Sequence, residues 1–120
     1  MERPGPSVLG FRVMSQDPDV DALLSKLFAL IRRIYADTEG MLDNPTEQQL
    51  WYDRGYANGM VRALRELGHG ELLQSQLKPD PEDLIAGQEP LVWGKAYVHG
   101  LEVGMRETHG VLGRKQDLGS

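Results

Sequence analysis

Two segments of the chain carry a small residue at every fourth position, and this spacing limits what either segment can fold into. The first row is Gly55, Gly59 and Ala63, and the second is Ala96, Gly100 and Gly104. Residues four apart lie on one face of an α-helix, so each row forms a flat stripe. Glycine inside a helix costs about 1 kcal/mol relative to alanine. We therefore expect close backbone contact along these two small-residue rows, with the helices crossing at Gly59 and Gly100.

The rest of the chain shows helical spacing and helix boundaries. Apolar residues recur at three- and four-residue steps after Asp17-Pro18-Asp19, which has the features of a helix start. Asn44 is the expected N-cap of a second helix, with Glu47 completing a capping box. We predict helices over about 17–39, 45–67 and 90–109, with short helical turns near 71–77 and 81–86, the latter capped by Asp80. The predicted fold is all-α, a small bundle of three main helices with short helical turns.

The two glycine-bearing helices resemble each other at an offset of 41 residues. Identical residues coincide at five positions, Leu50/Leu91, Tyr56/Tyr97, Gly59/Gly100, Arg65/Arg106 and Glu66/Glu107. This similarity predicts two degenerate helix–loop–helix repeats, at about 17–68 and 70–110. The helical domain then covers 17–110, between an N-terminal tail at 1–16 and a C-terminal tail at 111–120. A chance resemblance between two amphipathic helices is the alternative.

The chemistry of the side chains excludes several classes of site. Cysteine is absent, which excludes disulfides, cysteine-bound zinc, iron–sulfur clusters and thiol nucleophiles. Glu66 and His69 have the spacing of a helical-bundle metal site, but they straddle the expected helix end at Gly68. Neither a phosphate-binding glycine loop nor a nucleophile elbow occurs. The sequence thus predicts no metal, no cofactor and no catalytic residue, and it favours a non-enzymatic role.

Charge and hydropathy limit the partners. With 18 acidic and 13 basic residues the net charge is −5, so nucleic acid would bind only through a local basic patch. No stretch reaches the roughly 18 uncharged residues that span a membrane. Residues 1–10 lack the basic segment and apolar run of a signal peptide. We expect a cytoplasmic protein without a membrane partner, and nucleic acid is a disfavoured partner.

The helices have more apolar surface than three of them can easily enclose. Larger apolar residues lie opposite each small-residue row, so both helices have two contact faces. Open apolar patches usually mark an interface, and the sequence therefore favours a homodimer that acts through protein–protein interaction. Aromatic side chains are enriched in interaction hot spots. The candidate pocket or partner surface is Trp51, Tyr56, Asn58, Trp93, Tyr97 and His99.

Two other functions stay open at this point. A small-ligand binder or enzyme would use a pocket between the two repeats, and its polar groups would be the Tyr56/Tyr97 and Asn58/His99 pairs. A DNA-associated regulator would need a basic, exposed helix face. The nearest approach to such a face is Arg54, Arg62 and Arg65.

Overall fold

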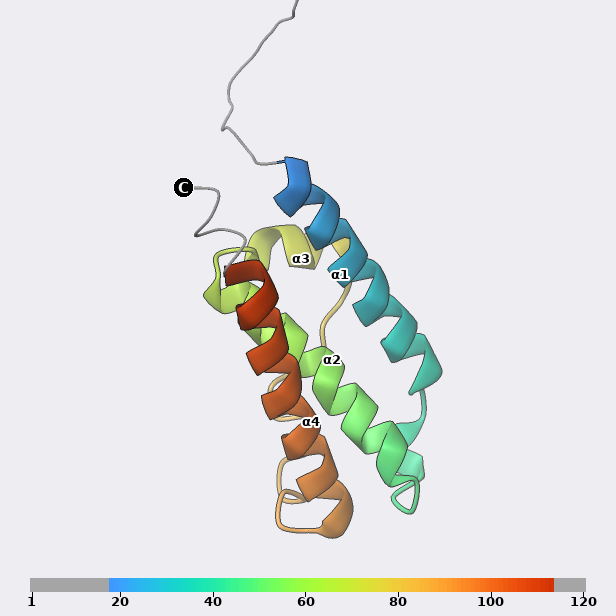
Figure 1. Cartoon of the computed structure of the whole chain (residues 1–120). Coiled ribbons are helices and arrows are strands. Elements are labelled where there is room, and N and C mark those ends of the chain that lie inside the picture. The colour runs from blue at the N-terminus through green and yellow to red at the C-terminus, as the bar shows by residue number, and fades with distance from the viewer. Residues whose placement is uncertain (1–17, 114–120) are drawn as a thin grey trace, which may run out of the picture.

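The computed structural model describes residues 18–113, and all secondary structure in this part of the chain is helical (Figure 1). In chain order the elements are α1 (Pro18–Asp37), the 3-10 turn η2 (Met41–Asp43), α2 (Gln48–Glu66), α3 (Gly70–Gln76), α4 (Val92–Thr108) and the π-helical turn η3 (His109–Gly113). The prediction of an all-α bundle with three main helices is confirmed. The predicted tail at 1–16 and the part of the other tail at 114–120 lie outside the described residues.

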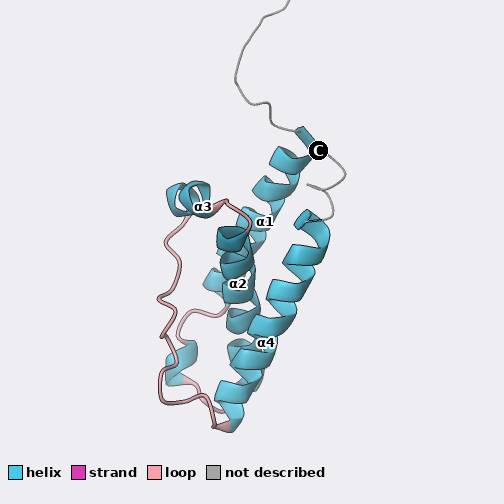
Figure 2. Cartoon of the chain, turned by 90° about the vertical axis from the view of Figure 1, so that its left-hand side faces the viewer, coloured by secondary structure: helices cyan, strands magenta, loops and turns pink. Residues whose placement is uncertain are grey.

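The long helices are not connected in a simple up-and-down order. α1 runs antiparallel to α2, whereas α2 and α4 run parallel and side by side (Figure 1). The chain must therefore return from the far end of α2 before α4 can begin. It does so through α3 and an irregular segment, residues 77–91, which we call the return strap (Figure 2).

The start of α2 differs from the predicted capping box. Glu47 is the N-cap residue and makes no side-chain capping hydrogen bond. The side-chain amide of Asn44 instead donates to the carbonyl oxygen of Gly40 at 2.8 Å, and the carbonyl oxygen of Asn44 accepts a hydrogen bond from the indole of Trp51 at 3.2 Å. Asn44 is thus occupied in closing the preceding turn, so the helix begins at Gln48.

The segment predicted as helical turns near 81–86 forms successive turns at residues 82–87, with backbone hydrogen bonds from Leu84 to Pro81 and from Ala86 to Asp83. Beyond the predicted helix end near 109, the helical structure continues past Gly110, because η3 follows α4 directly. Leu112 in that turn is fully buried in the core. Burial of a leucine side chain contributes about 2 kcal/mol, which outweighs the fraying tendency of a helix-terminal glycine.

Two apolar clusters hold the described elements together. The larger joins α1, α2, α3 and η3, and its buried members are Val20, Leu24, Phe28, Ile31, Ala57, Met60, Val61, Leu64, Leu73 and Leu112. The smaller lies where α2 and α4 begin, and its buried members are Met41, Trp51, Ile85 and Tyr97. Ile85 comes from the return strap, so the strap is part of the core at that end.

The small residues of α2 lie against the backbone of α4. A Cβ atom added to Gly55 would lie 2.0 Å from the carbonyl oxygen of Tyr97, and one added to Gly59 would lie 2.1 Å from that of Leu101. These distances are far inside van der Waals contact, so only glycine permits this approach. Ala63 continues the row and is fully buried.

The same contact is made from α4 toward α2. A Cβ atom on Gly100 would lie 2.1 Å from the carbonyl oxygen of Tyr52, and one on Gly104 would lie 2.2 Å from that of Tyr56. Ala96, the first member of this row, is partly buried against the smaller cluster. The two rows therefore lie within one helix–helix interface, in which each glycine meets backbone of the other helix.

The register of this interface is not the one suggested by the sequence similarity. Gly55 and Gly100 occupy equivalent places, as do Gly59 and Gly104, and the members of each pair are 45 residues apart. Two further identical pairs have the same spacing, Tyr52/Tyr97 and Met60/Met105. The offset of 41 residues therefore does not match the packing, and Gly59 and Gly100 do not face each other. Whether the two helices arose from a repeat stays a prediction.

Candidate functional site

A polar cluster joins α1, α2, α4 and the return strap in the interior. Its members are Tyr35, Thr38, Arg54, Asn58, Asp80 and Tyr97. Asn58 and Tyr97 belong to the predicted surface set, and the structure brings these two together. Sequence reasoning misses Tyr35 and Asp80, because it counts the tyrosine as an apolar helix residue and the aspartate as a helix cap. The prediction that Asp80 caps a helical turn is wrong, since its carboxylate binds Arg54 instead.

Arg54 is the central group of this cluster. Its Nε and Nη2 atoms donate to the two carboxylate oxygens of Asp80, at 2.6 and 3.0 Å. Its Nη1 atom donates to the carbonyl oxygen of Tyr35 at 3.1 Å and to the hydroxyl of Thr38 at 3.0 Å. The guanidinium carbon also lies 4.1 Å from the centroid of the Tyr35 ring, a cation–π arrangement. One side chain thus ties α2 to the end of α1 and to the strap.

Asn58 completes the network from the adjacent turn of α2. Its amide nitrogen donates to Asp80 at 2.9 Å and to the hydroxyl of Tyr97 at 2.8 Å. Its amide oxygen accepts a hydrogen bond from the hydroxyl of Tyr35. That hydroxyl in turn accepts one from the backbone N–H of Asp80 at 3.1 Å. The amide therefore has partners for both donors and its acceptor, as a buried polar group requires.

Burial and hydrogen bonding set the protonation of these groups. Burial alone would raise the pKa of Asp80, but hydrogen bonds from Arg54 and Asn58 and the charge of Arg54 outweigh it and lower that pKa. Burial likewise opposes the charge of Arg54, yet the Asp80 carboxylate raises the pKa of the guanidinium. Burial raises the pKa of the Tyr35 phenol to about 12. The cluster is thus an ion pair surrounded by neutral phenols.

This arrangement is a structural clamp, because its polar groups are paired with one another. The side chains of Arg54 and Asp80 are only 16% and 13% exposed. The space beside Asn58 and Tyr97 has a volume of about 10 Å³, enough for one water molecule at most. The clamp therefore fixes the return strap to α1 and α2.

The other predicted surface residues lie in separate places. The hydroxyl of Tyr56 donates to Glu107 at 2.5 Å, on the outside of the α2–α4 pair. The ring of His99 packs against Tyr52, with centroids 5.6 Å apart. Trp51 and Trp93 form a tilted pair with centroids 6.4 Å apart. Trp51, Trp93 and Tyr97 thus share the smaller apolar cluster, which Asn58 joins through Tyr97, whereas Tyr56 and His99 lie apart from it. Because Trp51 and Tyr97 are buried, the six residues do not form one surface.

No family model, curated protein or solved structure matches the chain. Among residues 18–113, no three histidine, aspartate or glutamate side chains are grouped so that they could hold a metal ion. None of the helices in this range is both long and apolar enough to cross a membrane.

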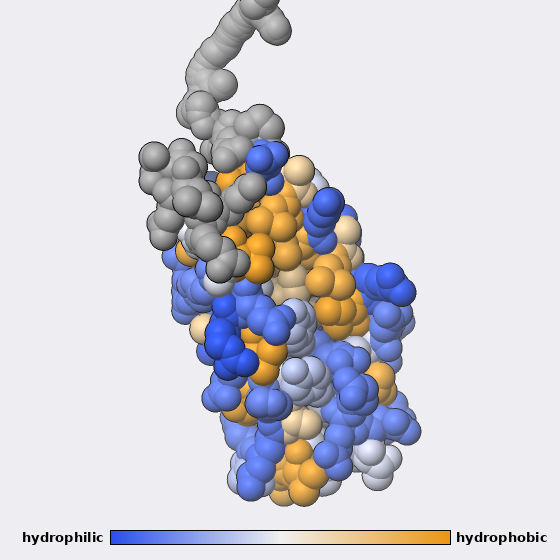
Figure 3. Space-filling view, in the orientation of Figure 1, coloured by the Kyte–Doolittle hydropathy of each residue, from blue (hydrophilic) through white to orange (hydrophobic). Residues whose placement is uncertain are grey.

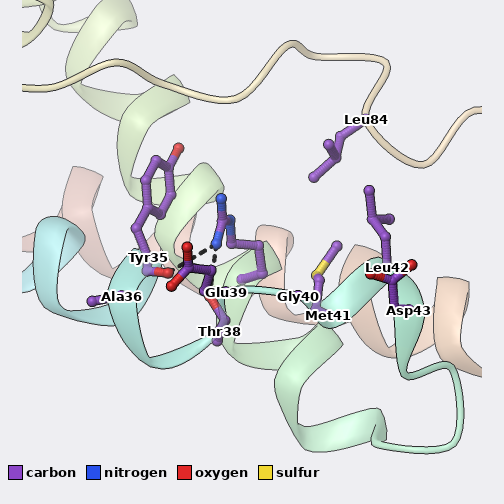
Figure 4. Close-up of a pocket in the computed structure, with 10 residues that line it drawn as sticks. Tyr35, Ala36, Thr38, Glu39, Gly40, Met41, Leu42, Asp43 and Leu84 are labelled. Atoms are coloured by element: carbon purple, nitrogen blue, oxygen red, sulfur yellow. Dashed lines mark hydrogen bonds between the residues drawn. The ribbon is translucent and has the colours of Figure 1, made fainter.

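An open pocket of about 610 Å³ lies where α1 ends and η2 begins (Figure 4). Its wall includes Tyr35 on one side and Leu42 and Leu84 on the other, with Met41 between them (Figure 4), and Arg54 also lines it. The volume is within the range of small-molecule sites, roughly 300–1,000 Å³. Sequence reasoning misses this pocket, because its walls come from three segments that are distant in the chain.

Apolar side chains are also exposed along one flank of α1. Four of them form what we call the apolar row, Leu23, Leu27, Leu30 and Ile34. Leu30 is 40% exposed, and the other three are half-buried and pack against the larger apolar cluster on one side. Figure 3 shows apolar surface gathered along α1 and in the space toward α4. Val111 of η3 is 44% exposed and lines a hollow together with Leu23 of α1.

Proposed function

We propose that the protein acts by self-association, as a homodimer formed through the apolar row of α1. The observation that carries the proposal is the partial exposure of this row, with Leu30 at 40%, on a face where apolar surface gathers (Figure 3). Contiguous exposed apolar surface on a small domain is typical of a protein–protein interface. The dimer thus depends on α1, because the small-residue rows of α2 and α4 are already occupied by each other.

The spacing of the apolar row suits a second copy of the same helix. The steps from Leu23 to Leu27 to Leu30 to Ile34 are four, three and four residues, which is the same in both directions. Two such helices packed antiparallel about a two-fold axis would place Leu23 opposite Ile34, and Leu27 opposite Leu30. An isologous interface needs this kind of self-complementary patch. The three–four spacing also matches the packing of antiparallel helix pairs.

The surroundings of the row offer a place for side chains of the second copy. A hollow of about 390 Å³ is lined by Asp19, Ala22, Leu23, Lys26 and Val111. It continues the apolar row at the first turns of α1 and reaches η3. Lys26 stands at its edge and is exposed. A polar rim around an apolar centre is the usual composition of an interface.

The DNA-associated alternative has less support from the geometry. Arg54 is paired with Asp80 in the interior, and Arg65 lies 3.6 Å from Glu82. Both cations are therefore largely compensated by acids of the return strap. A phosphate backbone needs uncompensated cations on one face.

Light scattering coupled to size exclusion tests the dimer. We expect a mass near twice the 13.4 kDa of the monomer, falling toward that value on dilution from about 100 to about 1 µM. Leu30→Glu buries two charges in the proposed interface and should weaken association at least about tenfold. Leu72→Glu is the matched control, because Leu72 on α3 is similarly exposed, at 44%, and lies outside the row. A wild-type mass that stays at 13.4 kDa throughout, or equal weakening by both variants, contradicts the proposal.

A further inference from the structure

The pocket at the end of α1 has an apolar wall that is open to solvent. Leu42 and Leu84 point toward the same space from η2 and from the return strap (Figure 4). The side chain of Leu42 is 47% exposed, whereas leucine is among the residue types that are most often buried in folded domains. Met41 is buried beneath them. An organic molecule with an aliphatic or aromatic body would cover this wall.

Negative charge predominates around the pocket. The C-terminal end of α1 carries the partial negative charge of the helix dipole, and no basic residue lies in its last turn. Glu39 and Asp43 line the pocket and add two carboxylates. The one cation in the lining is Arg54, and its charge is matched by the bidentate contact with Asp80. The local field is therefore negative.

We propose that this pocket binds a small organic cation with an apolar body. The cationic group lies toward Glu39 and the carbonyl end of α1, while the body packs on Leu42 and Leu84, and Asp43 beside Leu42 adds to the negative field (Figure 4). An anion of the same size is disfavoured, because it would meet two carboxylates and the negative end of a helix. The site differs from the pocket predicted between the repeats, and it does not depend on self-association, since the apolar row lies on a different flank of α1.

Hexylamine is a suitable probe, because it is an ammonium ion at neutral pH with a six-carbon chain. Hexanol and hexanoate serve as neutral and anionic probes of the same length. We expect hexylamine to shift the backbone amide signals of residues 38–43 and 84 in a proton–nitrogen NMR titration, with a dissociation constant on the order of 1 mM. Hexanol should bind at least about threefold more weakly and hexanoate more weakly still. Added salt should weaken the binding of hexylamine.

Two variants separate the pocket from the general negative charge of the protein. Glu39→Gln combined with Asp43→Asn should weaken hexylamine binding about threefold to tenfold. Asp37→Asn is the matched control, because Asp37 is an exposed acid at the same helix end that does not line the pocket and pairs with Arg33. It should leave the binding within about twofold. Equal binding of hexylamine and hexanoate, shifts spread over the whole surface, or equal weakening by the control overturns the proposal.

Discussion

A single methyl group added at Gly59 is expected to destabilise the whole domain. In Gly59→Ala the new Cβ atom would lie 2.1 Å from the carbonyl oxygen of Leu101 and 2.9 Å from the amide nitrogen of Met105. Both atoms belong to the backbone of α4, so no side-chain rotation can relieve the overlap. The helices must move apart by roughly 1 Å, and this opens the interface along its length.

The magnitude follows from two opposing effects. Alanine has the higher helix propensity, which contributes up to about 1 kcal/mol in favour of the variant. Overpacking in a rigid interior costs about 1–3 kcal/mol, and the upper end applies where backbone meets backbone. We expect a net loss of about 2 kcal/mol in the free energy of unfolding. For a domain of this size that loss lowers Tm by about 8–16 °C.

Thermal melting followed by circular dichroism at 222 nm measures this effect. Gly110→Ala is the matched control, because a Cβ atom there meets nothing within 4 Å and the residue also lies in a helical turn. Its Tm should be unchanged or slightly raised. In the double variant Gly59→Ala and Gly100→Ala, the two losses should be less than additive, because helices already separated by one methyl group leave room for the next. If Gly59→Ala melts at or above the control, the close helix contact is refuted.

The clamp gives two further expectations. Asp80→Asn leaves Arg54 without its carboxylate and should lower the free energy of unfolding by about 3 kcal/mol in urea titrations, whereas Asp37→Asn, in the exposed pair with Arg33, should change it by less than about 0.5 kcal/mol. The pKa of Asp80 is lower in the folded than in the unfolded protein, so its contribution is complete above the ordinary carboxyl pKa of 3.8 and is lost as the pH falls through the folded value. The stability difference between wild type and Asp80→Asn should therefore stay the same from pH 7 to about pH 5 and shrink below about pH 4, and a difference that is still constant at about pH 3 would count against the ion pair.

The small-residue rows show what local patterns can predict. Their spacing places Gly55 and Gly59 on one face of a helix, and the cost of glycine in a helix requires a compensating contact. Both statements need only one segment of sequence. The register between the two helices involves both segments at once. The sequence similarity has an offset of 41 residues and aligns Tyr56 with Tyr97, whereas the packing has an offset of 45 and aligns Tyr52 with Tyr97. The packing offset differs because the glycines determine how closely the two backbones approach.

The clamp could not be predicted from local patterns for a related reason. An aspartate between two prolines, Pro79-Asp80-Pro81, looks like a helix start, since it has a capping side chain before a first-turn proline. Nothing in that segment shows that Arg54 lies opposite. Pro81 disfavours helical geometry at Asp80, but a helix cap would be non-helical too. Only the structure shows that Asp80 lies outside the helices with its carboxylate on Arg54.

The parallel order of α2 and α4 explains why a clamp is needed at this place. A chain that leaves the end of α2 must travel back along it before α4 can start, and the 19 residues of α2 correspond to about 28 Å. The strap of residues 77–91 would cover only about 22 Å as a helix but up to about 50 Å when extended, so it cannot be one continuous helix, and it consists of an irregular stretch followed by turns. Such a strap buries few apolar side chains, here mainly Ile85. The Arg54–Asp80 pair and Asn58 supply the fixed point that apolar packing cannot, and they hold the strap where it also forms one wall of the pocket at the end of α1.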